Sequence, residues 1–130
     1  MTDPLAQKPA SLAGRRLLVV EDEYFIAEDI RVILERHGAA VIGPVGELAE
    51  ARDILACETR IDAAVLDINL HGETVFPLAD ELRARGVPFV FATGYSEAAI
   101  PSSYGGVPRW EKPYSYDDLV AALPSLVDAN

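Results

Sequence analysis

Short apolar runs alternate along the chain with segments in which apolar residues recur every three or four positions. The short runs are typical of strands, and the wider spacing is typical of helices that bury one face. This alternation predicts βαβ units and therefore a parallel sheet. The strands are predicted at residues 16–20, 40–43, 63–66, 88–92 and 108–111, and the helices at 23–36, 47–57, between Pro77 and Gly86, and at 116–123.

Glycine and proline residues indicate where several of these elements should end. Gly38 is placed to end the first helix in the left-handed conformation. Pro44 should cut the second strand short, and Pro124 should limit the last helix. The helix signal is poor over 96–104, which Pro101 interrupts, so we expect a short, irregular or mobile segment there.

The composition indicates a single domain. A chain of 130 residues, half of them apolar, is long enough to bury a core. No run approaches the length that spans a bilayer, and residues 1–14 lack the apolar core of a secretory signal, so we predict a flexible lead-in before a domain at 15–128. The single Cys57 cannot form an internal disulfide and is predicted to be a small buried residue. These features predict a soluble cytoplasmic protein.

The net charge excludes two classes of partner. The chain has 11 basic and 21 acidic residues, a net charge of −10. Such a chain has no general attraction for nucleic acid or for an anionic membrane surface. We therefore predict that neither is a partner.

Four of the predicted strands run into polar side chains that could handle a phosphoryl group. Glu21 and Asp22 follow the first strand, Asp67 the third, Thr93 the fourth and Lys112 the fifth. Because open α/β sheets bind ligands at the carboxyl ends of their strands, we expect these groups to share one pocket. Carboxylates that close repel one another unless a cation lies among them. The arrangement predicts a divalent metal ion and chemistry on an anionic oxygen.

These fragments, in this order and spacing, resemble the receiver domain of bacterial response regulators, a module of two-component signalling. The matching pieces are LVVEDE at 18–23, VLD at 65–67, ATG at 92–94 and KP at 112–113, and they cover roughly residues 15–126. FATGY at 91–95 and DINL at 67–70 also resemble the FAT GUY subfamily of receivers. The resemblance implies a flavodoxin-like α/β fold, a doubly wound five-stranded parallel sheet in the order 2-1-3-4-5 with helices on both faces.

The resemblance also implies the chemistry of the site. Asp67 would be the phosphoacceptor, which attacks the phosphorus of a phosphohistidine and becomes an acyl phosphate. Lys112 would pair with a phosphoryl oxygen, and Thr93 would hydrogen-bond to the phosphoryl group after transfer. Such catalysis consists mostly of positioning and electrostatics.

Mg²⁺ is the cofactor that the resemblance implies. Its ligands would be the carboxylates of Glu21, Asp22 and Asp67 and the backbone carbonyl of Asn69. Mg²⁺ prefers oxygen ligands and is usually held by one or two carboxylates and a phosphate, so the residue types agree with this assignment.

Each polar group also has a simpler explanation when it is taken alone. The acidic run 21–23 could be a helix start, which the helix dipole favours. Asp67 could be a turn residue, Thr93 a loop hydroxyl and Lys112 an exposed surface lysine. The joint pattern, rather than any single residue, favours the phosphoryl site.

The sequence departs from the common receiver pattern in the region that follows Thr93. Many receivers have an aromatic residue three positions before the lysine, where this chain has Arg109, and here Gly94 follows the threonine. Our hypothesis is that Tyr95, or ordering of the 96–106 segment on phosphorylation, replaces the usual coupling.

His71 is a second departure. It lies four residues after Asp67, in a loop predicted at 68–73, where many receivers have proline. Its position allows a place in the pocket wall or an effect on dephosphorylation, but an ordinary loop residue is the simpler interpretation.

The function implied is that of a single-domain response regulator that is a phosphoacceptor and not an enzyme. Its donor would be a sensor histidine kinase, of the HWE or HisKA-2 type by the subfamily resemblance, or a histidine phosphotransfer protein. It would signal by protein binding or onward phosphotransfer, as a monomer or a weak phosphorylation-dependent dimer. The alternative is an adaptor that docks to a kinase or another partner without being phosphorylated.

Two other classes with related architectures fit the sequence less well. A phosphatase of the haloacid dehalogenase type needs a second aspartate where this chain has Asn69. A nucleotide-binding protein needs a phosphate-cradling loop after the first strand, where the acidic run 21–23 would instead repel phosphate.

Overall fold

The computed structural model describes residues 12–58, 60–94 and 100–128. Within them a five-stranded parallel sheet has the order β2-β1-β3-β6-β7, which confirms the predicted order. The strands are β1 (Arg16–Val20), β2 (Ala40–Val45), β3 (Ala63–Leu66), β6 (Phe89–Thr93) and β7 (Arg109–Glu111). The α-helices are α2 (Tyr24–Arg36), α3 (Leu48–Cys57), α4 (Phe76–Ala84) and α5 (Tyr116–Asp128). None of the helices in these ranges is long and apolar enough to cross a membrane.

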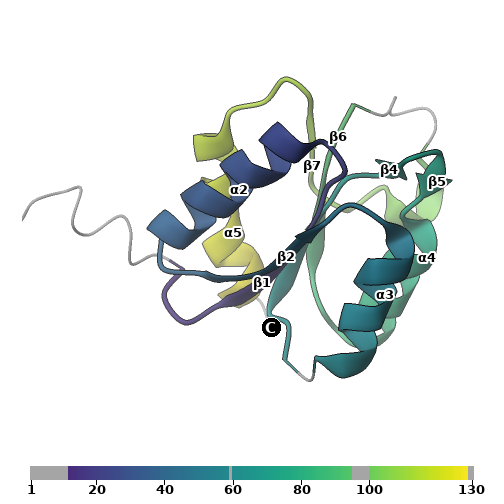
Figure 1. The fold of residues 1–130 in the computed structure, drawn as a ribbon, viewed down its shortest axis with the longest axis horizontal. Helices are drawn as coiled ribbons and strands as arrows, with labels where there is room; N and C mark the ends of the chain where they lie inside the picture. The colour runs from purple at the N-terminus through teal and green to yellow at the C-terminus, as the bar shows by residue number, and fades with distance from the viewer. Residues whose placement is uncertain (1–11, 59, 95–99, 129–130) are drawn as a thin grey trace, which may run out of the picture.

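The helices cover both faces of the sheet (Figure 1). Helices α2 and α5 pack on one face, and α3 and α4 pack on the other. In β1, Leu18 and Val20 join the core under α3 and α4, whereas Leu17 and Val19 join the core under α2 and α5. The central strand β3 is buried throughout, and burial on both faces explains why its sequence shows no polar alternation.

A short antiparallel hairpin replaces the loop predicted at 68–73. It consists of β4 (Asn69–Leu70) and β5 (Glu73–Thr74). His71 and Gly72 form its turn, and both have positive φ angles, of 50° and 87°. Two consecutive left-handed residues are typical of the turns that join hairpin strands. Strands of two residues are too short to show an alternating pattern, so the sequence did not reveal them.

Two prolines lie inside elements that they were predicted to end. β2 continues through Pro44, because β2 is the edge strand, where a residue without an N–H is tolerated. α5 continues past Pro124, because Leu123 and Val127, one turn apart, are both buried in the core. The position of β2 in the sheet and the burial of the residues around Pro124 thus outweigh the local preference of proline.

Cys57 is exposed, so its predicted burial was wrong. The buried face of α3 carries Ala51 and Leu55. Cys57 is two residues past Leu55, which places it on the opposite side of the helix.

Leu12 belongs to the packed domain, although the prediction placed it in the lead-in. Its side chain is fully buried, and its N–H donates to the carbonyl oxygen of His37 at 2.9 Å. The domain therefore begins before the predicted boundary at residue 15. Residues 1–11 of the predicted lead-in lie outside the described residues.

Part of the segment with a poor helix signal is described. Ser102–Tyr104 forms a single 3-10 turn. Residues 95–99, and with them Tyr95, lie outside the described residues. The hypothesis that phosphorylation orders the 96–106 segment therefore stays a prediction.

Gly43 lies where the register between β1 and β2 shifts, and its φ is +94°. A Cβ at Gly43 would lie 2.9 Å from the backbone nitrogen of Val45 and 3.0 Å from the carbonyl oxygen of Val19. Left-handed strain and overpacking together are expected to make Gly43→Ala lower the free energy of unfolding by about 2–3 kcal/mol, measured by urea denaturation.

Gly86 provides the matched control for this substitution. Its φ is +72°, but a Cβ there would meet nothing within 4 Å. Gly86→Ala should therefore lower the free energy of unfolding through left-handed strain alone, by about 1–2 kcal/mol. Equal losses in the two variants would contradict the packing argument.

Candidate functional site

The predicted site residues lie at the carboxyl edge of the sheet. The backbone N–H groups of Glu21, Asp67 and Lys112 donate to carbonyl oxygens of neighbouring strands at 2.8–2.9 Å. The hydrogen-bonded ladder thus continues past the last strand residue. It fixes the backbone of each polar residue beside the neighbouring strand, so the side chains converge.

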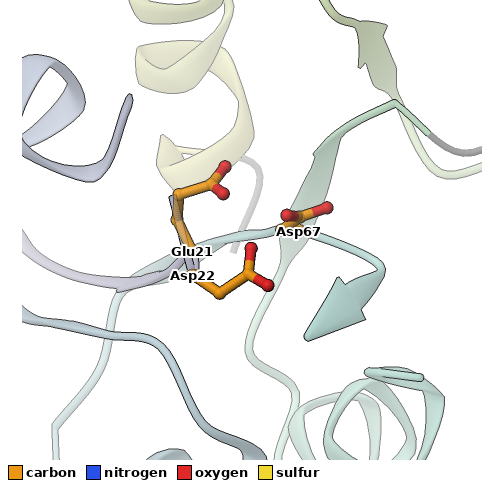
Figure 2. Close-up of side chains that lie close together, drawn as sticks. All are labelled: Glu21, Asp22 and Asp67. Atoms are coloured by element: carbon orange, nitrogen blue, oxygen red, sulfur yellow. The ribbon is translucent and has the colours of Figure 1, made fainter. Parts of the chain in front are cut away.

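Three carboxylates meet at this edge (Figure 2). Glu21 and Asp22 follow β1, Asp67 follows β3, and one oxygen of each lies within 4.8 Å of the other two. Glu21 and Asp67 are only 3% and 5% exposed. Because an ionised carboxylate loses several kcal/mol of hydration when it is buried, this cluster needs positive charge beside it.

Lys112 supplies part of that charge. Its Nζ donates to Glu21 Oε2 at 3.1 Å and to Asp67 Oδ2 at 3.3 Å, and it lies 3.5 Å from Glu23 Oε1. Glu21 Oε1 is also 3.1 Å from Nζ, but the approach lacks hydrogen-bond geometry. This buried oxygen accepts no hydrogen bond from any of the described residues.

The electrostatics show that one ammonium does not balance the cluster. Burial, and next the nearby charge of Asp67, raise the pKa of Glu21 to about 8. Burial also raises the pKa of Asp67. Burial opposes the charge on Lys112, but Asp67 and Glu21 together outweigh it and raise the pKa of the ammonium. Without a further cation, the carboxylate pair therefore retains a proton near neutral pH.

Thr93 ends β6 beside the acidic cluster. It is 1% exposed, and its side chain makes a hydrogen bond with Asp67. The next residue, Gly94, is exposed, and a Cβ there would meet nothing within 4 Å. The Thr93 hydroxyl is thus close to any group attached to Asp67, and the space beside Gly94 is open.

The β4–β5 hairpin closes the site on the other side. The backbone N–H of His71 donates to Asp22 Oδ2 at 3.0 Å, and Asn69 Oδ1 accepts the N–H of Gly72 at 3.0 Å. The second bond ties the Asn69 side chain into the turn. Between the hairpin and the strand ends is a cavity of about 320 Å³. It is lined by Asp22, Glu23, Asp67, Asn69, His71, Gly72, Thr93, Gly94 and Lys112.

The structure brings all of the predicted site residues into one place. They are Glu21, Asp22, Asp67, Asn69, Thr93 and Lys112. The sequence analysis did not predict that Glu23 lies beside Lys112, which the structure shows. The signal was present, because a residue two positions after Glu21 on extended backbone projects to the same side.

The donor set fits a divalent metal ion. Carboxylate oxygens are the ligands that Mg²⁺ prefers, and three are gathered here. Glu21 Oε1 accepts no hydrogen bond from the described residues, and the raised pKa of both buried carboxylates shows that Lys112 alone does not keep them ionised. A bound cation would favour the ionised form.

Comparisons with known proteins agree with this geometry. The family model of the response regulator receiver domain matches residues 17–123, a range that includes every predicted site residue. The transcriptional regulatory protein PdtaR of Mycobacterium tuberculosis is 26% identical over 127 residues, which cover 95% of this chain and 61% of PdtaR. The chain spans about three fifths or less of the length of the curated relatives it matches.

Two solved structures are similar to this chain in both sequence and fold. The solution structure of SdrG from Sphingomonas melonis is 38% identical, with a TM-score of 0.76, and the match covers 87% of this chain and 96% of SdrG. The BeF3-activated conformation of SdrG from Pseudomonas melonis is 37% identical, with a TM-score of 0.71, and the match covers 88% and 98% of the two chains.

Proposed function

The chain belongs to the response regulator receiver domain family, and we propose that it accepts a phosphoryl group on Asp67 and signals by protein binding or onward phosphotransfer. One observation carries the proposal. The buried Asp67 carboxylate faces a cavity, with the Lys112 ammonium 3.3 Å away and the Thr93 side chain hydrogen-bonded to it. An acceptor carboxylate, an ammonium beside it and a hydroxyl that contacts the acceptor are thus present together.

The proposed transfer begins with an oxygen of Asp67. It attacks the phosphorus of a phosphohistidine on the donor protein, so that a P–O bond forms as the P–N bond breaks. The electron pair of the broken bond stays on the imidazole nitrogen, and Asp67 becomes an acyl phosphate. Asp67 must be ionised to attack, and its raised pKa opposes this. The carboxylate pair therefore has to lose its retained proton first.

The chain offers a metal site for that purpose. The carboxylates of Glu21, Asp22 and Asp67 and the backbone carbonyl of Asn69 would hold Mg²⁺. When bound, Mg²⁺ offsets the negative charge of the carboxylates and of the transferred group. Of the two proposed ligands that follow β1, Asp22 is the more open and lines the cavity, whereas Glu21 is buried and does not.

Lys112 and Thr93 would respond to the product. Lys112 would exchange its contact with Asp67 Oδ2 for a phosphoryl oxygen, since in the acyl phosphate the carboxyl oxygens are uncharged and the negative charge is on the phosphoryl oxygens. Thr93 would donate its hydroxyl to the phosphoryl group. Because Thr93 is the last residue of β6, its movement would alter the surface that follows this strand.

The partners follow from the chemistry. The donor would be a sensor histidine kinase or a histidine phosphotransfer protein, and the net charge of −10 disfavours nucleic acid as a target. The BeF3-activated conformation of SdrG supports phosphoryl control, because beryllofluoride resembles a phosphoryl group in shape and charge. The assignment to HWE or HisKA-2 kinases, and the role as a phosphoacceptor rather than an enzyme, stay predictions.

The test is phosphorylation by a small donor. The protein is incubated with Mg²⁺ and acetyl phosphate, and its intact mass is measured. We expect a single phosphoryl adduct, and no adduct when EDTA is present. Absence of an adduct with both acetyl phosphate and a histidine kinase would contradict the proposal and favour the unphosphorylated adaptor.

A further inference from the structure

Glu23 lines the cavity at the carboxyl edge of the sheet but has no part in the roles described above. Its Oε1 lies 3.5 Å from Lys112 Nζ. The Glu23 side chain is 61% exposed, whereas Glu21 and Asp67, the other two carboxylates beside Lys112, are buried. Glu23 is therefore the carboxylate that Lys112 meets on the open side of the site, and a donor that enters the cavity comes close to its charge.

The position of Glu23 in the fold does not account for its side chain. Glu23 is the N-cap residue of α2, where a short polar side chain commonly accepts a backbone N–H of the first turn. The Glu23 side chain makes no such capping bond. Its backbone N–H instead donates to Glu21 Oε2 at 3.1 Å, and its carboxylate lies beside Lys112. The negative charge is thus placed at the cavity rather than at the start of the helix.

The charge of Glu23 would remain in place during the proposed transfer. The other carboxylates that line the cavity, Asp22 and Asp67, are proposed metal ligands, whereas Glu23 is not. Glu23 therefore keeps its negative charge beside the ammonium that is proposed to pair with a phosphoryl oxygen. An anionic donor is repelled by this carboxylate and also competes with it for Lys112.

We propose that Glu23 selects among phosphodonors by charge, so that the chain reacts slowly with free, fully ionised phosphate compounds. This inference rests on the phosphoacceptor role proposed for Asp67. The favoured donor carries less negative charge around its phosphoryl group, as a phosphohistidine does where basic residues of its protein surround it. Glu23 thus determines specificity, and no bond to the phosphorus forms or breaks at its side chain.

The competing explanation is that Glu23 only forms a surface ion pair with Lys112. A pair as exposed as this one contributes little to stability. Its removal would free Lys112 equally for every donor, so the rates with different donors would change by the same factor. Selection by charge predicts instead that the factor depends on the charge of the donor.

The experiment compares two small donors on the whole chain and on its Glu23→Gln variant. Acetyl phosphate is fully deprotonated near neutral pH, whereas phosphoramidate retains a proton and carries less negative charge. Initial rates of phosphoryl adduct formation are measured by intact mass at saturating Mg²⁺. We expect Glu23→Gln to raise the rate with acetyl phosphate by roughly threefold to tenfold, and the rate with phosphoramidate by much less. The gain with acetyl phosphate should shrink at high ionic strength, because salt screens the charge of an exposed carboxylate.

Glu50→Gln is the matched control, because it makes the same change of residue and net charge at an exposed position in the first turn of α3, outside the cavity lining. It should leave both rates unchanged. The proposal is overturned by a similar gain in Glu50→Gln, by an equal change with both donors, or by a gain that salt does not reduce. An unchanged or lower rate of Glu23→Gln with acetyl phosphate would overturn it too. Failure of the parent protein to form an adduct with either donor would instead contradict the proposed function.

Discussion

Replacing Asp67 by asparagine is expected to abolish the phosphoryl adduct that forms with Mg²⁺ and acetyl phosphate. The amide is a far weaker nucleophile than a carboxylate and cannot form the acyl phosphate. Asp67 is also the carboxylate that both Lys112 and Thr93 contact, so no other acceptor in the cluster has the same surroundings. Intact-mass measurement of the variant after incubation should show only the unmodified protein.

Asp53→Asn is the matched control, because Asp53 is exposed on α3, away from the cluster. This variant should be phosphorylated like the parent protein. Asp67→Asn should also remain folded, since the amide preserves the size of the side chain and removes a negative charge beside Glu21. Its free energy of unfolding without metal should not fall. An adduct that persists in a folded Asp67→Asn protein would exclude Asp67 as the acceptor.

The position of the site could be predicted from sequence because Glu21, Asp67 and Lys112 directly follow strands of the sheet and Thr93 ends another. A parallel sheet brings such positions to one edge, whatever the loops do. The order of these four residues along the chain, each at the carboxyl end of a parallel strand, therefore determined where the groups meet. Their protonation could not be predicted, since it depends on burial and on distances between strands far apart in sequence.

The features that sequence reasoning missed depend on tertiary packing. Pro44 disfavours a strand and Pro124 disfavours a helix by local preference. Pro44 is tolerated because its strand lies at the edge of the sheet, and Pro124 because its helix buries apolar neighbours. Leu12 gave no periodic signal, because it is a single residue that packs beside the end of α2. The position of His71 beside Asp22 depends on the hairpin turn, and the turn is recognised only from the pairing of β4 with β5.

The buried carboxylate pair should make stability depend on pH in the opposite way to an ordinary ion-paired carboxylate. The pKa of Glu21 rises from 4.5 to about 8 on folding, through burial and the charge of Asp67. Between these values the folded protein binds more protons than the unfolded chain, so the free energy of unfolding falls as pH rises. In metal-free buffer we expect a loss on the order of 3 kcal/mol between pH 5 and pH 8, measured by urea denaturation.

Glu21→Gln isolates this contribution, because the amide does not titrate. The variant should lose most of the slope between pH 5 and pH 8, whereas Asp53→Asn should keep it. The lowered pKa of Asp62, where the backbone N–H of Arg16 and the Arg60 side chain outweigh burial, acts below pH 4 and does not enter this window. A slope that is absent in the parent protein, or unchanged in Glu21→Gln, would contradict the assignment.

Metal binding should reverse the pH dependence. A divalent ion that binds the ionised carboxylates competes with the proton they retain, so its affinity rises with pH across the same window. Because binding to the folded state alone stabilises it by mass action, Mg²⁺ should raise the melting temperature more at pH 8 than at pH 5.5. Glu21→Gln should reduce that difference. Loss of the retained proton thus lowers the stability of the metal-free protein, and the same negative charge favours the divalent ion that we propose for this site.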